Sequence, residues 1–395
     1  MDIHPSHRAQ SVKASPTLAV SAKAARLRAD GRDILSLAAG EPDFETPEHV
    51  KTAAIDAINE GFTKYTSVDG TPELKEAVVG KFARENNLHF NPDQVLVSCG
   101  CKHSIYNLMQ ALLNPGDEVI IPAPYWVSYP DMARLAGAET VIIKTSIEHQ
   151  FKITPEQLRG AIGDKSRLLV LNSPSNPTGA CYSEAELEAL GAILAEHPEI
   201  VIASDDIYEH ILWSGQPFRN ILNAFPSLHD RTVVLNGVSK AYAMTGWRIG
   251  YAAGPEAIIS AMKEIQSQST SGPNSIAQVA AAAALSGDQG LLENHCAAFR
   301  RRHDFVVDAL NEIDGVAIVA SDGTFYSFPD MSAAITARSD VDTDIELAEL
   351  LLDRASVAVV PGSAFGAPGC LRLSYATDME TLDRALTQMQ EVLGS

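Results

Sequence analysis

NGVSKAYAMTGWRIG, at residues 236–250, is the most informative stretch of this sequence. Lys240 follows the hydroxyl residue Ser239, and Arg248 comes eight positions later, inside a Gly-Trp-Arg-Ile-Gly turn. Most lysines are solvated surface residues, but the flanks of this one are not surface-like. Thr232–Leu235 predicts a buried strand, and small and hydroxyl residues follow where a surface loop would carry charges. The stretch therefore predicts a functional lysine in a loop after a buried strand.

A lysine in such a loop suits pyridoxal phosphate. The Lys240 amine can form the Schiff base with the aldehyde of the cofactor, while Ser239 and Arg248 can both reach its phosphate. We therefore take pyridoxal phosphate as the expected cofactor.

Composition excludes several other classes of protein. The 395 residues can bury a large core, with 46% hydrophobic and 20% charged residues. A net charge of −20 argues against non-specific nucleic-acid binding and against binding to anionic membranes. No apolar run approaches the roughly 18 residues of a membrane span, and the N-terminus lacks the apolar core of a signal peptide. Five cysteines without metal-ligand spacing predict reduced thiols, no metal site and a cytoplasmic protein.

Seven apolar runs between residues 95 and 253 predict strands that are buried on both faces, because their apolar residues are consecutive. Helical patterns lie between them, such as His103–Leu113 and the helix that Ser183 and Glu186 can cap. The fold class is therefore α/β, with a wound, mainly parallel seven-stranded sheet. The seven runs are Val95–Ser98, Glu118–Ile121, Thr140–Ile143, Arg167–Leu171, Ile200–Ala203, Thr232–Leu235 and Gly250–Ala253.

The C-terminal third differs and predicts a smaller α+β domain. We expect a large domain over residues 46–290, with residues 1–45 packing onto a small domain formed by residues 291–395. Helices are expected at Ala297–Ile313, Ile345–Leu352 and Met379–Leu393, and strands at Val316–Val319, Phe325–Phe328, Val357–Val360 and Leu371–Ser374.

Polar residues follow the predicted strands at their carboxyl ends, where ligands bind in wound sheets. Asp205, just past Ile200–Ala203, can pair with a pyridinium nitrogen and keep it protonated; the alternative is a helix N-cap. Tyr208 can hydrogen-bond the ring oxygen of the cofactor, although a lone tyrosine is more often a core residue. Asn176, in a loop fixed by two X-Pro bonds, can donate to the same oxygen or belong to a plain turn.

Three further positions suggest ligand contacts. The amides of Gly100 and Cys101, at the start of a helix, form an anion cradle for a phosphate. An indole at Trp126 can stack on the pyridine ring or belong to the core. Arg372, inside the apolar strand Leu371–Ser374, needs a bidentate carboxylate partner, supplied either by a substrate or by a structural salt bridge.

Taken together, these motifs resemble the class I aminotransferases of pyridoxal-phosphate fold type I, and most closely the bacterial Iβ aspartate aminotransferases. The likeness runs from about Ser15 to the C-terminus. Its motifs are LAAGEPDF (37–44), KY (64–65), GTPEL (70–74), PYW (124–126), NPTG (176–179), SDDIY (204–208), SK (239–240), GWR (246–248) and LRLSY (371–375).

The resemblance implies a role for each site residue. Lys240 is the Schiff-base lysine and proton carrier, and Asp205 pairs with the pyridine nitrogen. The other implied cofactor contacts are Tyr208, Asn176, Trp126, Gly100, Cys101, Lys102, Ser239, Arg248 and, from the neighbouring subunit, Tyr65. The implied substrate contacts are Gly40, Trp126, Asn176, Arg372, Lys102, Ser15 and Thr17. The expected assembly is a homodimer with composite active sites. Asp206 and the two cysteines around Gly100 depart from the pattern of the group.

The resemblance also implies the reaction: transfer of an amino group between an L-amino acid and a 2-oxo acid. Aspartate or glutamate is expected, because Lys102 matches a lysine that binds the distal carboxylate, and Ser15 and Thr17 match hydroxyl residues that close over the substrate. A solvated Lys102 in the first turn of a helix is the alternative. Prephenate, aromatic and alanine substrates stay open, as does C–S lysis, whereas the Arg372 grip disfavours decarboxylation.

Overall fold

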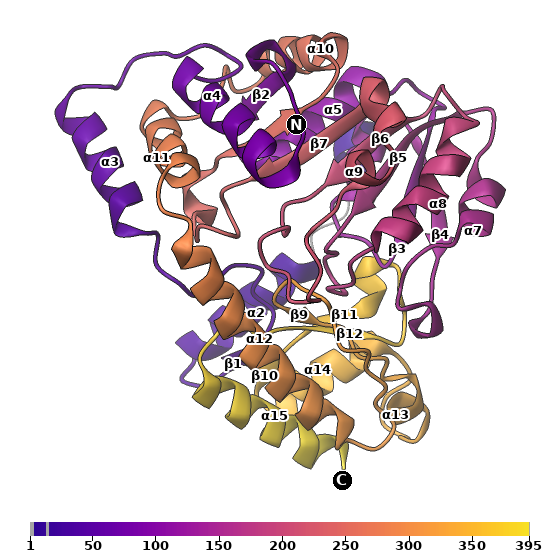
Figure 1. The fold of residues 1–395 in the computed structure, drawn as a ribbon. Coiled ribbons are helices and arrows are strands. Elements are labelled where there is room, and N and C mark those ends of the chain that lie inside the picture. The colour runs from indigo at the N-terminus through magenta and orange to yellow at the C-terminus, as the bar shows by residue number, and fades with distance from the viewer. Residues whose placement is uncertain (1–3, 13–15, 395) are drawn as a thin grey trace.

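The computed structural model describes residues 4–12 and 16–394. All seven predicted strands form, and they join one sheet in the order β2-β8-β7-β6-β5-β3-β4 (Figure 1). β8 runs antiparallel to both of its neighbours, and the other pairs are parallel, so the predicted mainly parallel sheet is confirmed. The strands are β2 (Val95–Ser98), β3 (Glu118–Ala123), β4 (Glu139–Lys144), β5 (Ser166–Asn172), β6 (Val201–Asp205), β7 (Thr232–Gly237) and β8 (Gly250–Ala253).

The sheet separates two apolar cores, which explains why its strands are apolar at consecutive positions. Leu168 and Val170 of β5 pack into one core, whereas Leu169 and Leu171 pack into the other. α5 (Cys101–Leu112), α6 (Tyr129–Leu135) and α10 (Glu256–Ser267) cover the first face. The second core contains α3 (Glu48–Asn59), α4 (Pro72–Lys81), α7 (Pro155–Ala161), α8 (Glu184–Ala195), α9 (Ile221–Ala224) and α11 (Ser275–Ser286).

Local sequence signals set several helix ends. Ser183 and Glu186 form the predicted capping box at the start of α8, each side chain bonding the backbone amide of the other. α5 begins at Cys101, two residues before the predicted start, because Gly100, with φ +90°, ends the preceding turn.

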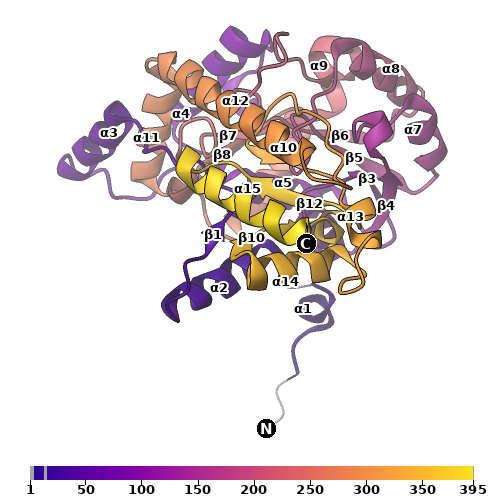
Figure 2. The ribbon, with the colours of Figure 1, turned by 90° about the horizontal axis from the view of Figure 1, so that it is seen from below.

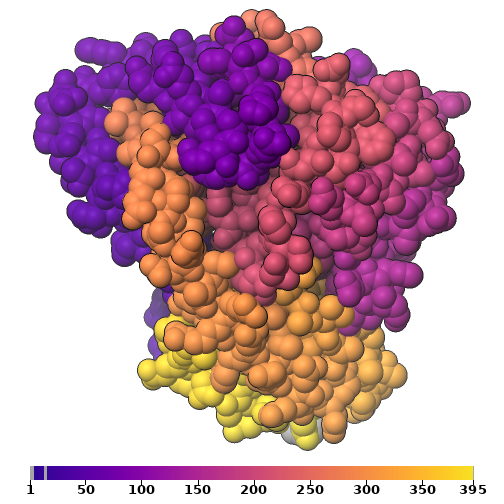
Figure 3. All heavy atoms as spheres, in the orientation of Figure 1, coloured from indigo at the N-terminus to yellow at the C-terminus, as the bar shows by residue number. Residues whose placement is uncertain are grey.

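The C-terminal elements gather with the N-terminal segment below the large sheet, and Figure 2 shows this side. β1 (Leu35–Ser36) pairs with β10 (Val357–Ala358), and β12 (Leu371–Ser374) lies between β11 (Val360–Pro361) and β9 (Tyr326–Ser327). The long helix α12 (Gly290–Asn311) descends from about the middle of the molecule into its lower part (Figure 1), and its orange atoms follow the same course in the space-filling view (Figure 3). The helices here are α2 (Pro16–Ala29), α12 (Gly290–Asn311), α13 (Ser332–Thr336), α14 (Asp344–Arg354) and α15 (Met379–Leu393), whereas α1 (His7–Ser11) lies against α6.

Two predicted strands are wrong in detail. Val316–Val319 forms only an isolated bridge between Ala317 and Asp330. The opposite segment pairs mainly on its other side: Asp330 also bridges Cys370, and the Pro329 carbonyl accepts from the Leu371 amide of β12. Val357–Val360 divides into β10 and β11, which belong to different sheets.

Short single turns complete the chain. They are a π-helical turn at Phe82–Asn86 and 3-10 turns at Pro92–Gln94, Ile147–His149, Pro226–Arg231, Thr245–Trp247 and Gly362–Phe365. Within residues 4–12 and 16–394, every helix is too short or too polar to span a bilayer.

Candidate active site

The carboxyl ends of β5, β6 and β7 open into a cavity of about 520 Å³, which brings most of the predicted site residues together. Asn172, Asp205 and Gly237 end these neighbouring strands, so the residues that follow them converge on one edge of the sheet. The predicted residues that line the cavity are Thr17, Gly40, Cys101, Lys102, Trp126, Asn176, Asp205, Tyr208, Ser239, Lys240, Arg248 and Arg372.

Lys240 projects into this cavity from the loop that follows β7. Its Nζ lies 2.5 Å from the carbonyl oxygen of Gly40 and 5.9 Å from the centre of the Tyr208 ring. Burial, aided by the positive charge of Arg372, lowers the pKa of Lys240 to about 8. The neutral, nucleophilic amine is therefore more populated near neutral pH than in an ordinary lysine.

Asp205 is the last residue of β6 and is only 3% exposed. Its carboxylate accepts hydrogen bonds from the Tyr129 hydroxyl (2.5 Å), from the Ile207 amide (3.4 Å) and, more weakly, from the Cys101 thiol (3.9 Å). Burial raises the pKa of Asp205 to about 6, and these donors oppose that rise. No helix follows Asp205 directly, so it is not a helix N-cap in the described chain.

Arg372 is buried, and within residues 4–12 and 16–394 no carboxylate pairs with it. Its guanidinium donates to Asn176 Oδ1 (3.0 Å) and to the carbonyl oxygen of Ala38 (2.9 Å), and its Nε has no partner. It also lies over the rings of Tyr326 and Phe365, 4.5 and 5.0 Å from their centres. Among the described residues the structural salt bridge considered above is therefore not formed, and the buried cation has no anionic partner there.

Tyr208 is buried, and its hydroxyl lies 3.1 Å from the hydroxyl of Tyr326 on β9. Asn176 is held by its backbone amide, which donates to Asn172 Oδ1 (2.8 Å). Tyr129 and Tyr326 both belong to this site, yet sequence reasoning missed them. Tyr129 could have been predicted from its position, three residues after Trp126 at a helix start. Tyr326 comes from a distant strand, and no sequence feature indicated that it belongs to the site.

An anion-binding cradle forms where α5 begins. A Cβ on Gly250 would lie 2.0 Å from the Cys101 amide nitrogen, so only glycine lets the start of α5 pack this closely against β8. Likewise, a Cβ on Gly100 would lie 2.4 Å from Arg248 Nη2. The helix N-terminus, the Arg248 guanidinium and the Ser239 hydroxyl together suit a phosphate.

The mouth of the cavity carries a second cation. Lys102 Nζ lies 4.7 Å from the centre of the Trp126 ring. Partial burial of the ammonium group and the nearby charge of Arg248 lower the pKa of Lys102. Thr17, near the start of α2, lines the same mouth, whereas Ser15 lies outside the described residues.

Tyr65 does not reach the cavity of its own chain. Its side chain is fully exposed, at 100%, in a separate hollow that it shares with residues 270–275. Of the predicted site residues, it is the one that the structure places on an open surface away from the cavity.

The residues of the cavity fit pyridoxal phosphate. They supply an amine for its aldehyde, a buried carboxylate for its ring nitrogen, a phenol and an amide for its ring oxygen, and a cradle for its phosphate. The fit depends on the two glycines that leave no room for a Cβ beside the cradle.

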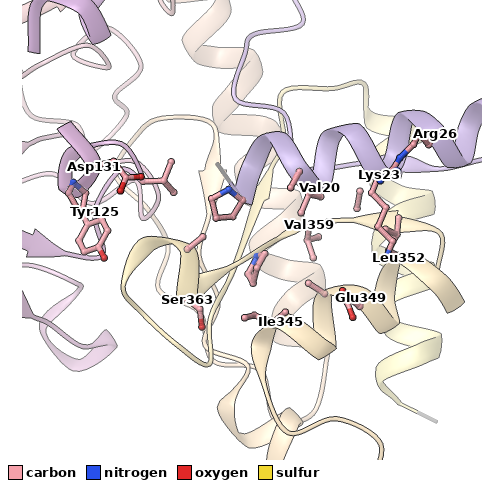
Figure 4. A pocket seen from close by; sticks show the side chains of 18 of the residues that line it. Val20, Lys23, Arg26, Tyr125, Asp131, Ile345, Glu349, Leu352, Val359 and Ser363 are labelled. Carbon is pink, nitrogen blue, oxygen red and sulfur yellow. The ribbon is translucent and has the colours of Figure 1, made fainter. Parts of the chain in front are cut away.

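Two other places in the structure, a second hollow and a cluster of acidic residues, lack the groups that would bind pyridoxal phosphate. A hollow of about 580 Å³ between α2, α6 and α14 is lined largely by apolar side chains such as Val20, Leu352 and Val359 (Figure 4). None of the predicted site residues lines it. Glu85, Glu209 and His210 have metal-like spacing, but the buried ammonium group of Lys81 pairs with both carboxylates.

The departures at Asp206 and Cys99 leave the site chemistry in place. Asp206 is buried and accepts from the Ser204 hydroxyl and the Asn220 amide, so its side chain is occupied outside the cavity. The Cys99 thiol points to the Gly272 carbonyl. All five cysteines are free thiols.

Comparison with known proteins agrees with the fold. The model of the family "Aminotransferase class I and II" matches residues 32–389. An aspartate/prephenate aminotransferase of Nitrosomonas europaea is 57% identical, over 98% of this chain and 99% of its own. The structure of the aspartate aminotransferase from Rhizobium meliloti superposes with a TM-score of 0.96 at 45% identity, covering 100% of this chain and 99% of its own.

A further relative carries a dicarboxylate. The structure of the Thermus thermophilus aspartate aminotransferase with maleate has a TM-score of 0.93 at 45% identity and covers 99% of this chain and 100% of its own. The family match and these identities over nearly whole chains lead to one conclusion: this chain belongs to the class I and II aminotransferases, whose cofactor is pyridoxal phosphate.

Proposed function

We propose that this chain transfers the amino group between an L-dicarboxylic amino acid, aspartate or glutamate, and a 2-oxo acid by a ping-pong mechanism. One observation carries the proposal: the Lys240 amine shares its cavity with two cations that lack carboxylate partners in the described chain, Arg372 inside and Lys102 at the mouth. Two cations suit two carboxylates. The printed names of the relatives, and the maleate held by the Thermus protein, support this assignment.

The residues divide the work as follows. Bound pyridoxal phosphate supplies an electron sink for the carbanion that forms at the substrate Cα. Lys240 would hold the cofactor aldehyde and carry the proton that leaves Cα. Asp205 would keep the ring nitrogen protonated, and Tyr208 and Asn176 would hydrogen-bond the ring oxygen.

Other residues bind and orient. Trp126 would stack on the pyridine ring, while Ser239, Arg248 and the amides of Gly100 and Cys101 would hold the phosphate. Arg372, with the Gly40 segment, binds the α-carboxylate. Thr17 lines the cavity, and closure of its segment over the substrate would exclude water; Ser15, the other hydroxyl residue proposed for this role, lies outside the described residues.

A second substrate class is favoured by the apolar part of the cavity mouth, where Leu18, Ile105 and Val127 line the wall. Such a wall accepts a ring, so prephenate or an aromatic amino acid is the alternative, and C–S lysis is a more remote one. A half-reaction screen tests the proposal: each amino acid is added to the holoenzyme, and the absorbance of the bound cofactor reports conversion to its amine form. Release of a thiol without that conversion would indicate a lyase instead.

Lys102→Ser is expected to lower kcat/KM for aspartate by roughly tenfold to a thousandfold, on the scale of a lost charge-assisted hydrogen bond. Alanine, which has no distal carboxylate, keeps its kcat/KM. Steady-state kinetics with both amino acids measure the difference, and Lys23→Ala, in the separate hollow of Figure 4, is a matched control. Equal losses for the two substrates would show that Lys102 does not read the side chain.

The active unit is proposed to be a homodimer. Tyr65 is fully exposed, and Ile55, Ile58 and Phe62 expose further apolar surface on α3 and just after it. By this proposal the face packs against a second copy, and Tyr65 reaches the phosphate of the neighbouring subunit.

Sedimentation at assay concentration is expected to give a dimer. Tyr65→Phe is expected to weaken cofactor binding, because one hydrogen bond to the phosphate is lost. In a mixed dimer, a Lys240→Ala subunit is paired with a Tyr65→Phe subunit. The site in the Tyr65→Phe subunit then combines its own intact Lys240 with the intact Tyr65 of the other subunit, and this site is expected to regain tight cofactor binding. A fully active monomer would contradict the proposal.

We also propose the domain division expected above, with the large domain at residues 46–290 and the small domain formed by residues 1–45 and 291–395. The pairing of β1 with β10 supports the inclusion of the N-terminal segment. The five free thiols support a cytoplasmic location.

A further inference from the structure

Two side chains hold the carboxylate of Asp205, one at each oxygen. The hydroxyl of Tyr129 donates to Oδ2 at 2.5 Å, and the thiol of Cys101 lies 3.9 Å from Oδ1. All three residues are buried, with 2%, 8% and 3% exposure for Tyr129, Cys101 and Asp205. Each carboxylate oxygen therefore has a side-chain donor inside the protein.

The local fold explains why these two side chains reach Asp205. Tyr129 is the first residue of α6, and its ring packs edge-to-face on Trp126, with centres 5.3 Å apart. Cys101 is the first residue of α5, which packs tightly against β8 because Gly250 has no side chain. Two helix starts on the same face of the sheet thus present an O–H and an S–H to the end of β6.

The two donors act against the effect of burial. Burial favours the neutral carboxyl group, whereas hydrogen bonds to the carboxylate favour its ionised form. Burial and the negative charge of Asp205 together raise the pKa of both Tyr129 and Cys101 well above their usual values, so both keep their protons. They are therefore permanent donors to a carboxylate that must stay charged.

We propose that Tyr129 and Cys101 are positioning residues that keep Asp205 ionised and aimed at the ring nitrogen of pyridoxal phosphate. This rests on the role proposed for Asp205. The proton between the ring nitrogen and Asp205 stays on nitrogen when the carboxylate is stabilised. Without the donors the carboxylate is more basic, and the proton moves toward its oxygen, which gives a neutral pair.

Several other groups face the same carboxylate and stay constant in the test. The amine of Lys240 and the hydroxyl of Tyr208 interact electrostatically with Asp205. The amide of Ile207 donates to Oδ1. A change in Tyr129→Phe or Cys101→Ala therefore reports the deleted donor.

The test uses holoenzyme loaded with pyridoxal phosphate that is ¹⁵N-labelled in the ring. In Tyr129→Phe the ¹⁵N resonance is expected to move toward the position of an unprotonated pyridine nitrogen, and cofactor dissociation is expected to accelerate roughly tenfold. Cys101→Ala moves the resonance in the same direction by less, because a thiol is a weaker donor. Cys101→Ser, which restores a hydroxyl donor, reverses that movement.

Tyr182→Phe is the matched control, since Tyr182 is a buried tyrosine whose hydroxyl accepts the Ile153 amide away from the cofactor cavity. Tyr182→Phe is expected to leave the ring ¹⁵N resonance at the wild-type position, even if the substitution lowers the stability of the fold. Asp205→Asn removes the carboxylate itself and shows how far the ring ¹⁵N resonance moves when the nitrogen loses its charged partner. If Asp205→Asn leaves the resonance unchanged, the proposed role of Asp205 itself fails. If Asp205→Asn moves it while Tyr129→Phe and Cys101→Ala do not, only the positioning inference is overturned.

Discussion

Replacing Lys240 by alanine is expected to lower turnover by at least roughly 10⁴-fold while leaving the fold intact. The side chain makes one hydrogen bond within the described structure, to the carbonyl of Gly40, so its removal disturbs little packing. The loss takes away both the covalent attachment of the cofactor and the group that carries the Cα proton. The phosphate cradle at Gly100 and Arg248 remains, and some cofactor binding is therefore retained.

The measurement is single-turnover conversion of the bound cofactor with aspartate, followed by absorbance. Lys240→Arg is a second variant that keeps the positive charge, and it is expected to be equally inactive, because a guanidinium neither attacks the aldehyde nor releases a proton. Lys23→Ala serves as the surface control. Near-normal activity in Lys240→Ala would show that another residue carries the reaction.

The same lysine predicts a pH dependence for cofactor uptake. With a pKa of about 8, the amine is mostly protonated at lower pH and does not attack the aldehyde. The rate at which the apoenzyme forms the covalent attachment is therefore expected to rise with pH and to level off above about 8. A pH-independent rate would contradict the assignment of Lys240 as the attacking amine.

Asp205→Asn is expected to slow turnover by roughly 10³-fold, the scale on which removal of one preorganised electrostatic group slows enzymes. Asparagine keeps the shape of the side chain and can still accept from Tyr129, but it does not hold a proton on the ring nitrogen. Steady-state kinetics with aspartate measure the loss.

Stability separates a chemical loss from a folding defect. The folded-state pKa of Asp205 lies above its ordinary value, so ionising this buried group destabilises the folded apoenzyme as pH rises through about 6. Asparagine stays neutral, and thermal unfolding of Asp205→Asn at pH 7 is expected at or above the wild-type temperature. Asp206→Asn, a buried neighbour whose side chain bonds Ser204 and Asn220 outside the cavity, is expected to keep turnover within a few-fold. Equal losses in the two variants would remove the special role of Asp205.

Much of the fold was predictable because its signals are local. Consecutive apolar residues such as Leu168–Leu171 require burial on both faces, and all seven such runs became strands of one sheet. The failures came where pairing depends on a distant segment. Val316–Val319 has strand-like residues, but it forms only the Ala317–Asp330 bridge, because the opposite segment pairs mainly with the residues around Cys370.

The candidate site shows the same division. The sequence by itself determined which groups stand at the carboxyl ends of strands, so Lys240, Asp205 and Asn176 could be named in advance. Only the tertiary structure decided what surrounds them. Tyr129 and Tyr326 reach Asp205 and Tyr208 from other elements, and Arg372 lies buried beside Asn176, 196 positions away in the chain, without a carboxylate partner in the described residues. Strand patterns and loop motifs are encoded in neighbouring residues, whereas contacts between distant segments exist only once the chain has packed.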